Sequence, residues 1–110
     1  MADQRLLALV QEDRHLDFNR VVEGIEGVVD LSGGQFRAYD LRKFNLRKAN
    51  LSNCYMRSAD LRGLDLSEAQ LEGTSLKDAK VSGTFFPYNI AAEEIRLSIE
   101  QGTRLRATRR

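Results

Sequence analysis

The 110-residue chain has one cysteine, one histidine, one proline and no tryptophan. A single cysteine cannot form an internal disulfide, and one histidine with one cysteine cannot supply a conventional zinc site. The longest apolar run near the start, residues 6–10, is too short for a membrane span or a signal sequence. The chain also lacks a glycine-rich phosphate loop. We therefore expect a cytoplasmic protein with no metal, no other cofactor and no membrane contact.

What the chain has instead is an apolar residue at every fifth position between residues 31 and 86. A helix repeats its apolar face near 3.6 residues and a strand near 2, so a period of five fits neither. A short period kept over such a length indicates a coil wound about an axis. The twelve positions are Leu31, Phe36, Leu41, Leu46, Leu51, Met56, Leu61, Leu66, Leu71, Leu76, Val81 and Phe86.

Each five-residue unit is expected to point two side chains inward and three outward. The third outward position carries residues that tolerate tight corners or a positive φ. We therefore predict that the chain turns at this position in every unit. The residues concerned are Gly33, Asn53, Ser58, Gly63, Gly73, Asp78 and Gly83.

Three units, Ala49–Asn53, Ala59–Gly63 and Ala69–Gly73, resemble the A(D/N)LXX repeats of pentapeptide-repeat proteins. The resemblance covers residues 29–86, about half the chain. It implies a mainly β fold, a right-handed quadrilateral parallel β-helix with four units per square turn. Residues twenty apart would then stack about 4.8 Å from each other, in about three coils.

The resemblance divides the chain into an N-terminal helical cap (1–28), the β-helix (29–86) and a C-terminal helix with a basic tail (87–110). The cap begins with a predicted helix over residues 3–12, for which Asp3 is a suitable N-cap. Residues 15–23 fit either a second short helix or an irregular first coil. Residues 1–28 carry three arginines against six acidic residues, whereas residues 87–110 carry five arginines against three glutamates.

The repeat is expected to end at Phe85-Phe86, because Pro87 cannot donate to another ladder. A helix is predicted over residues 90–101, with Asn89 as N-cap and Gly102 just beyond its end. Residues 103–110 are polar and basic, so we expect them to be frayed unless a partner orders them.

Two adjacent outward faces of the predicted coil are basic. One carries Arg37, Arg57 and Lys77, and the next carries Arg42 and Arg62. Like charges about 5 Å apart repel by roughly 0.8 kcal/mol even at the dielectric of water. The faces are either solvated and paired with neighbouring aspartates, or a docking surface for an acidic protein or a phosphate-bearing partner. Nucleic acid is disfavoured, since surface aromatics are few and no base-reading motif is present.

The predicted C-terminal helix has two apolar seams, although a helix that covers one end of a coil needs only one. Ile90 and Leu97 lie nearly opposite the seam that contains Ile95 and Ile99. We take Ile90, Leu97 and Ile99 as candidate contacts between copies of the chain. In the alternative interpretation, Leu97 packs under the tail.

No residue is assigned a catalytic role. Cys54 occupies an inward position and is interpreted as a core residue, and His15 has no partners that would mark a triad. Asp40 and Asp60 stack one coil apart, but in the family this position is ordinarily Asp or Asn, which implies a role in the turn.

The sequence therefore favours a non-enzymatic protein–protein interaction or scaffold module, self-associating or part of a larger assembly. The alternative is a binder of an anionic partner, either nucleic acid or an acidic protein. Mimicry of DNA on gyrase, the best-known activity of the family, is disfavoured: those proteins are long acidic rods, whereas this repeat is net positive and short.

Overall fold

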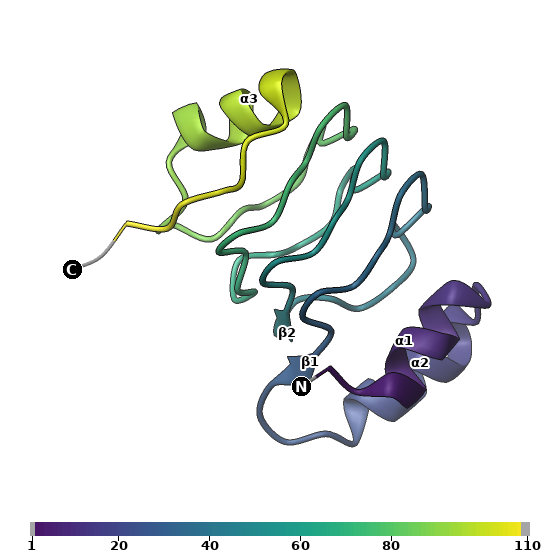
Figure 1. Cartoon of the computed structure of the whole chain (residues 1–110). Coiled ribbons are helices and arrows are strands. Elements are labelled where there is room, and N and C mark those ends of the chain that lie inside the picture. The colour runs from purple at the N-terminus through teal and green to yellow at the C-terminus, as the bar shows by residue number, and fades with distance from the viewer. Residues whose placement is uncertain (1, 109–110) are drawn as a thin grey trace.

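The structure is a computed structural model that describes residues 2–108. The elements follow in the order α1 (Gln4–Gln11), α2 (His15–Glu23), β1 (Val29–Asp30), β2 (Ala49–Asn50) and α3 (Ala92–Gln101). A coiled middle segment lies between α1 and α2 at one end and α3 at the other (Figure 1). No helix within residues 2–108 has the length and apolar character needed to cross a membrane.

Residues twenty apart are hydrogen-bonded neighbours in the coiled segment. β1 and β2 pair in parallel, with Val29 opposite Ala49. The same spacing continues in isolated parallel bridges, such as Asp40 to Asp60 and Asp60 to Lys80. Backbone hydrogen bonds of 2.7–3.1 Å join successive coils, so each coil packs on the next.

The structure contains little regular β-strand, so the predicted mainly β fold is confirmed only in part. β1 and β2 have two residues each, whereas the helices have eight, nine and ten. The reason is the corner in every five-residue unit, which leaves too few extended residues for a longer strand. The β-type pairing is therefore found mainly in the parallel bridges and backbone hydrogen bonds between successive coils.

The predicted inward residues form the core. Leu31, Leu51 and Leu61 are fully buried, and Leu41 is 1% exposed. Cys54 is also buried; its thiol donates to the Leu31 carbonyl at 3.2 Å, and burial raises its pKa to about 11. The column loosens at its C-terminal end, where Val81 and Phe86 are only partly buried.

Backbone geometry confirms the predicted corners. All seven residues predicted at the third outward position have a positive φ, between 58° and 81°. Ala38 occupies the same position and also has a positive φ, of 62°. This corner could not be predicted from its residue type, because alanine does not favour a positive φ.

At the N-terminal end, Asp3 caps α1 as predicted, accepting hydrogen bonds from the backbone of Arg5 and Leu6. Residues 15–23 form α2, which resolves the ambiguity in favour of a helix. The Asn19 side chain holds α2 on the coil by donating to the Lys43 carbonyl at 2.9 Å and accepting from the Asn45 amide at 2.7 Å.

At the C-terminal end, α3 begins two residues later than predicted. Its first residue is Ala92 and its N-cap is Ala91, so Asn89 is not the cap. The amide of Ile90 instead bonds the Pro87 carbonyl in a preceding turn. The predicted end is confirmed, because Gly102 follows the helix with φ 77°.

The expectation of a frayed tail is wrong for residues 103–108. The Leu105 amide donates to the Thr74 carbonyl and its carbonyl accepts from the Gly73 amide, both at 2.8 Å. Arg104 lies antiparallel to Ser75, and Leu105 is 1% exposed. The tail is ordered because it fills hydrogen-bonding positions of the last coil. Residues 109–110, the rest of the predicted tail, lie outside the described residues.

Candidate functional site

The first predicted basic face forms a stacked column, but its members differ. Backbone bonds of 2.8 Å place Arg37, Arg57 and Lys77 on successive coils. Arg37 and Arg57 are exposed, and within residues 2–108 neither forms an ion pair. Lys77 donates to the Glu100 carbonyl at 2.6 Å and lies 3.7 Å from Asp78. The free cations of this face are thus Arg37 and Arg57, here called the arginine column.

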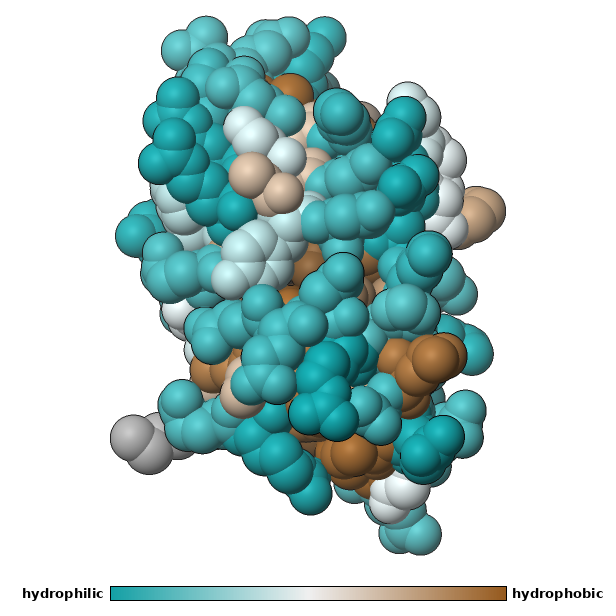
Figure 2. All heavy atoms as spheres, turned by 90° about the vertical axis from the view of Figure 1, so that its right-hand side faces the viewer, coloured by the Kyte–Doolittle hydropathy of each residue, from teal (hydrophilic) through white to brown (hydrophobic). Residues whose placement is uncertain are grey.

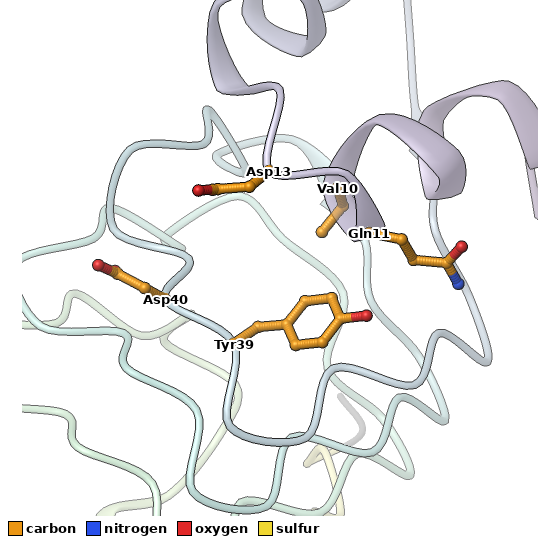
Figure 3. Close-up of a pocket in the computed structure, with 5 residues that line it drawn as sticks. All are labelled: Val10, Gln11, Asp13, Tyr39 and Asp40. Atoms are coloured by element: carbon orange, nitrogen blue, oxygen red, sulfur yellow. The ribbon is translucent and has the colours of Figure 1, made fainter.

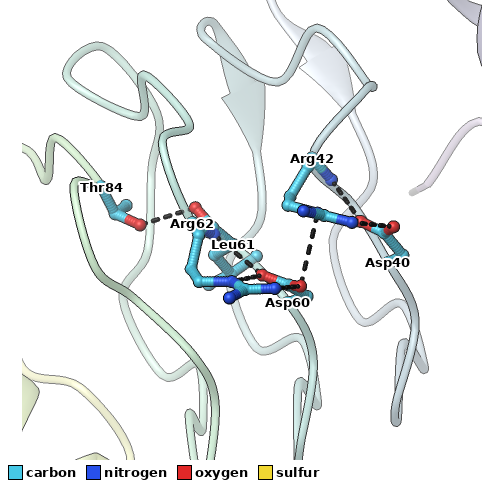
Figure 4. Close-up of polar contacts among 6 residues, drawn as sticks. All are labelled: Asp40, Arg42, Asp60, Leu61, Arg62 and Thr84. Carbon is cyan, nitrogen blue, oxygen red and sulfur yellow. Dashed lines mark hydrogen bonds and ion pairs between the residues drawn. The ribbon is translucent and has the colours of Figure 1, made fainter.

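The second predicted basic face is electrically balanced by aspartates. Arg42 contacts Asp40 at 2.9 Å and Asp60 at 3.3 Å, and Arg62 contacts Asp60 at 2.7 Å (Figure 4). Acid and base alternate along the coil axis, so each arginine faces a carboxylate. For Arg42 and Arg62 the structure therefore favours a solvated, internally paired face.

The same contacts fix the ionisation of the two aspartates. Hydrogen bonds from the Arg42 side chain hold the pKa of Asp40 well below its usual range, and those from Arg62 lower the pKa of Asp60 to about 2. A general acid near neutral pH needs a raised pKa instead. Each aspartate also accepts the backbone amide two residues ahead, at 3.1 and 3.2 Å. Their role is in the turn, as predicted.

The three candidate contacts between copies are not equally accessible. Leu97 is 41% exposed, whereas Ile90 is 5% exposed. Ile90 lies in the core and precedes α3, so it does not share the helix face inferred for it and is not accessible on the surface. Ile99 is partly buried. Leu97 is the accessible member of the set.

A pocket that the sequence analysis missed lies between the N-terminal helices and the first coil. It has a volume of about 190 Å³ and is lined by Val10, Gln11, Asp13, Tyr39 and Asp40 (Figure 3). Its two halves are some thirty residues apart in the chain, and no periodicity relates them. Only the docking of α1 on the coil brings them together.

No group of three or more His, Cys, Asp or Glu side chains within residues 2–108 could hold a metal ion. Figure 2 shows a largely hydrophilic face with small, separate hydrophobic areas. The distinctive features of the chain are hence its columns of outward side chains and the two ends of its coil.

A stacked coil of five-residue units defines a β-helical repeat protein. A family model described as pentapeptide repeats matches residues 40–78 and 54–86, with eight copies of the repeat. Residues 40–86 thus carry the repeats of the pentapeptide-repeat family. Neither the curated proteins nor the solved structures contain a match to it.

Proposed function

We propose that the chain is a non-enzymatic protein-interaction module. Its scaffold is a right-handed quadrilateral β-helix of about three coils over residues 29–86, capped by residues 1–28 and 87–110. The twenty-residue ladder and the position of the helices at the two ends of the coil (Figure 1) support this scaffold. A rigid coil of this kind holds outward side chains in columns, which suits recognition of a partner in the cytoplasm.

The observation that carries the proposal is the arginine column. Arg42 and Arg62, on the neighbouring face, are paired with aspartates, whereas Arg37 and Arg57 stack without such partners within residues 2–108. Like charges about 5 Å apart repel by roughly 0.8 kcal/mol at the dielectric of water. A carboxylate-rich surface of another protein would remove the repulsion. Nucleic acid is the weaker alternative, because two free cations support few phosphate contacts.

The test is recovery of partners on a tagged chain from native cells. Arg57→Glu should lower the recovered complex at least several-fold, because it reverses one charge of the column, and should not lower the melting temperature, because it also removes the repulsion from Arg37. Arg20→Glu is the matched control, since it makes the same charge reversal at an exposed site on α2. Equal recovery with Arg57→Glu and the unaltered chain would contradict the proposal.

We also propose that copies of the chain associate through α3. Leu97 supports this, because a leucine 41% exposed in the middle of a helix gains from being covered. Leu97→Ser should lower the mass measured by light scattering. A monomeric unaltered chain would end this part of the proposal.

A further inference from the structure

The hydrogen-bonding pattern between coils identifies two open positions at the N-terminal end. The amide of Asp60 donates to the Tyr39 carbonyl at 2.9 Å, and its carbonyl accepts from the Leu41 amide at 3.0 Å. Both polar groups of Asp60 thus face the preceding coil. Asp40 is the residue in register one coil earlier, and no coil precedes it.

The neighbouring face repeats this arrangement. Tyr55 bonds the preceding coil through both its amide and its carbonyl, at 2.9 and 2.8 Å, and Gln35 is its partner in register. Within residues 2–108, nothing pairs with the backbone amide or carbonyl of Gln35 or Asp40, and both residues are exposed. Unpaired backbone groups of this kind are a template for an added strand.

The other positions at this end are already filled. The Asp30 carbonyl accepts from the Asp3 amide at 2.8 Å, and the Asn45 amide donates to the Asn19 side chain at 2.7 Å. The N-terminal segment therefore covers two faces of the first coil and leaves the Gln35 and Asp40 faces open.

The opposite end shows how an extended segment fills such positions in this molecule. Leu105 makes two backbone hydrogen bonds of 2.8 Å to the last coil and buries its side chain to 1% exposure. One residue in an extended conformation is enough to pair with the coil and to place an apolar side chain against it.

A pocket adjoins the open position at Asp40. Its volume of about 190 Å³ is below the roughly 300–1,000 Å³ of small-molecule sites and suits a single side chain. Tyr39 and Val10 provide its apolar lining, and the carboxylates of Asp13 and Asp40 point to the same side of it (Figure 3). Asp13 forms no ion pair within residues 2–108, so it can receive a cation.

We propose that this end of the coil binds an extended peptide segment of another protein, in which an apolar residue stands next to a basic one. The segment pairs its backbone with Asp40, inserts the apolar side chain between Tyr39 and Val10, and places the basic group on Asp13. The proposal rests on the interaction function proposed above and adds a second surface, separate from the arginine column.

The chain's own tail has this chemistry, with Leu105 between two arginines. It is held on its own molecule, however, because Leu105 is buried and Arg106 lies 2.6 Å from Glu94. We therefore assign the site to a foreign segment and use the sequence of residues 103–108 as a synthetic probe.

The experiment measures binding of this labelled hexapeptide by fluorescence polarisation, and hydrogen exchange of backbone amides by NMR. In the free protein the Asp40 amide should exchange much faster than the Asp60 amide, and saturating peptide should slow it at least about tenfold. A peptide with an N-methylated leucine should bind about tenfold more weakly, because it loses one backbone donor.

The variant Asp13→Asn should weaken binding about fivefold while keeping the fold, since asparagine tolerates the φ of 58° found at this position. Asp78→Asn is the matched control, because Asp78 has φ 60° and lies on the last coil, and it should bind the peptide unchanged.

Unchanged exchange at Asp40, or equal binding of the N-methylated peptide, would overturn the proposal. Protection of Asp40 that grows with concentration of the protein alone would also overturn it, by showing that a second copy is the occupant. Failure of the peptide with continued sensitivity of the captured complex to Arg57→Glu would reject this inference and leave the proposed function standing.

Discussion

The corner position shows most directly how single residues shape this coil. Glycine adopts a positive φ without steric cost, whereas other residues pay about 1–2 kcal/mol in the left-handed region. Four of the described corners with a positive φ nevertheless use other residues, at Ala38, Asn53, Ser58 and Asp78. Alanine is the least suited of these, because it has no polar side chain to support the turn.

We expect Ala38→Gly to raise the free energy of unfolding by about 0.5–1 kcal/mol, the relief of φ strain less the entropy of glycine. The reverse change, Gly63→Ala, should lower it by more than about 1 kcal/mol. Since a Cβ at Gly63 would meet no atom within 4 Å, this variant isolates backbone strain. Urea unfolding measures both changes, and equal stability of the two variants would refute the explanation.

The paired aspartates predict an acid dependence. The pKa of Asp60 falls from 3.8 to about 2 on folding, chiefly through the Arg62 side chain. A carboxyl with a lowered pKa stabilises the fold above its unfolded pKa, and this contribution disappears as the pH falls from about 4 through 2. Asp60→Asn should therefore flatten the decline of the melting temperature over this range. An unchanged pH profile would mean that the pair contributes nothing.

At the scale of elements, the N-terminal and C-terminal segments cover parts of the two ends of the coil by different means. α2 uses the carboxamide of Asn19 in place of a backbone pair. The tail uses its own backbone together with the buried side chain of Leu105. An uncovered solenoid end exposes unpaired backbone and apolar side chains, so these segments contribute to stability as well as covering the core.

Leu105→Ala should destabilise the chain by about 2–5 kcal/mol, the range for truncating a buried leucine. The amides of Gly73 and Leu105 should then exchange faster. Leu97→Ala is the control on α3, because Leu97 is 41% exposed and its truncation should cost less. Equal stability losses for the two variants would show that the tail does not seal the core.

The molecule as a whole depends on one continuous column. In a solenoid each coil contacts only its neighbours, so a defect in the middle coil separates the two ends. Leu61 is fully buried, one step from Leu41 and Val81. An aspartate in place of Leu61 would bury a charge among apolar side chains that cannot pair with it.

Leu61→Asp should therefore abolish the cooperative thermal transition and the folded NMR spectrum. Leu97→Asp introduces the same charge at an exposed site and should keep both. A cooperative transition at unchanged temperature in Leu61→Asp would contradict the assignment of the core.

The period of five predicted the inward column and the turn positions, whereas the stacking of residues twenty apart was implied by the resemblance to pentapeptide-repeat proteins. The inward column and the turn positions are local properties that repeat from unit to unit, so the spacing of Leu, Gly and Asp along the chain is enough to predict them. The sequence also predicted Asp3 as the N-cap of α1 and Gly102 as the end of α3, because each of these residues lies next to the helix terminus that it specifies.

Only the tertiary structure decided which outward charges are free, where the tail lies and what the N-terminal end leaves open. Arg42 and Arg57 occupy equivalent positions in their repeats, yet only Arg42 reaches a carboxylate on its own and the next coil. Residues 103–108 are mostly polar and basic in sequence, and they are ordered because Leu105 forms backbone hydrogen bonds to Gly73 and Thr74 on the last coil. Such contacts join residues that no periodicity relates, so they follow from docking in three dimensions and not from the local pattern.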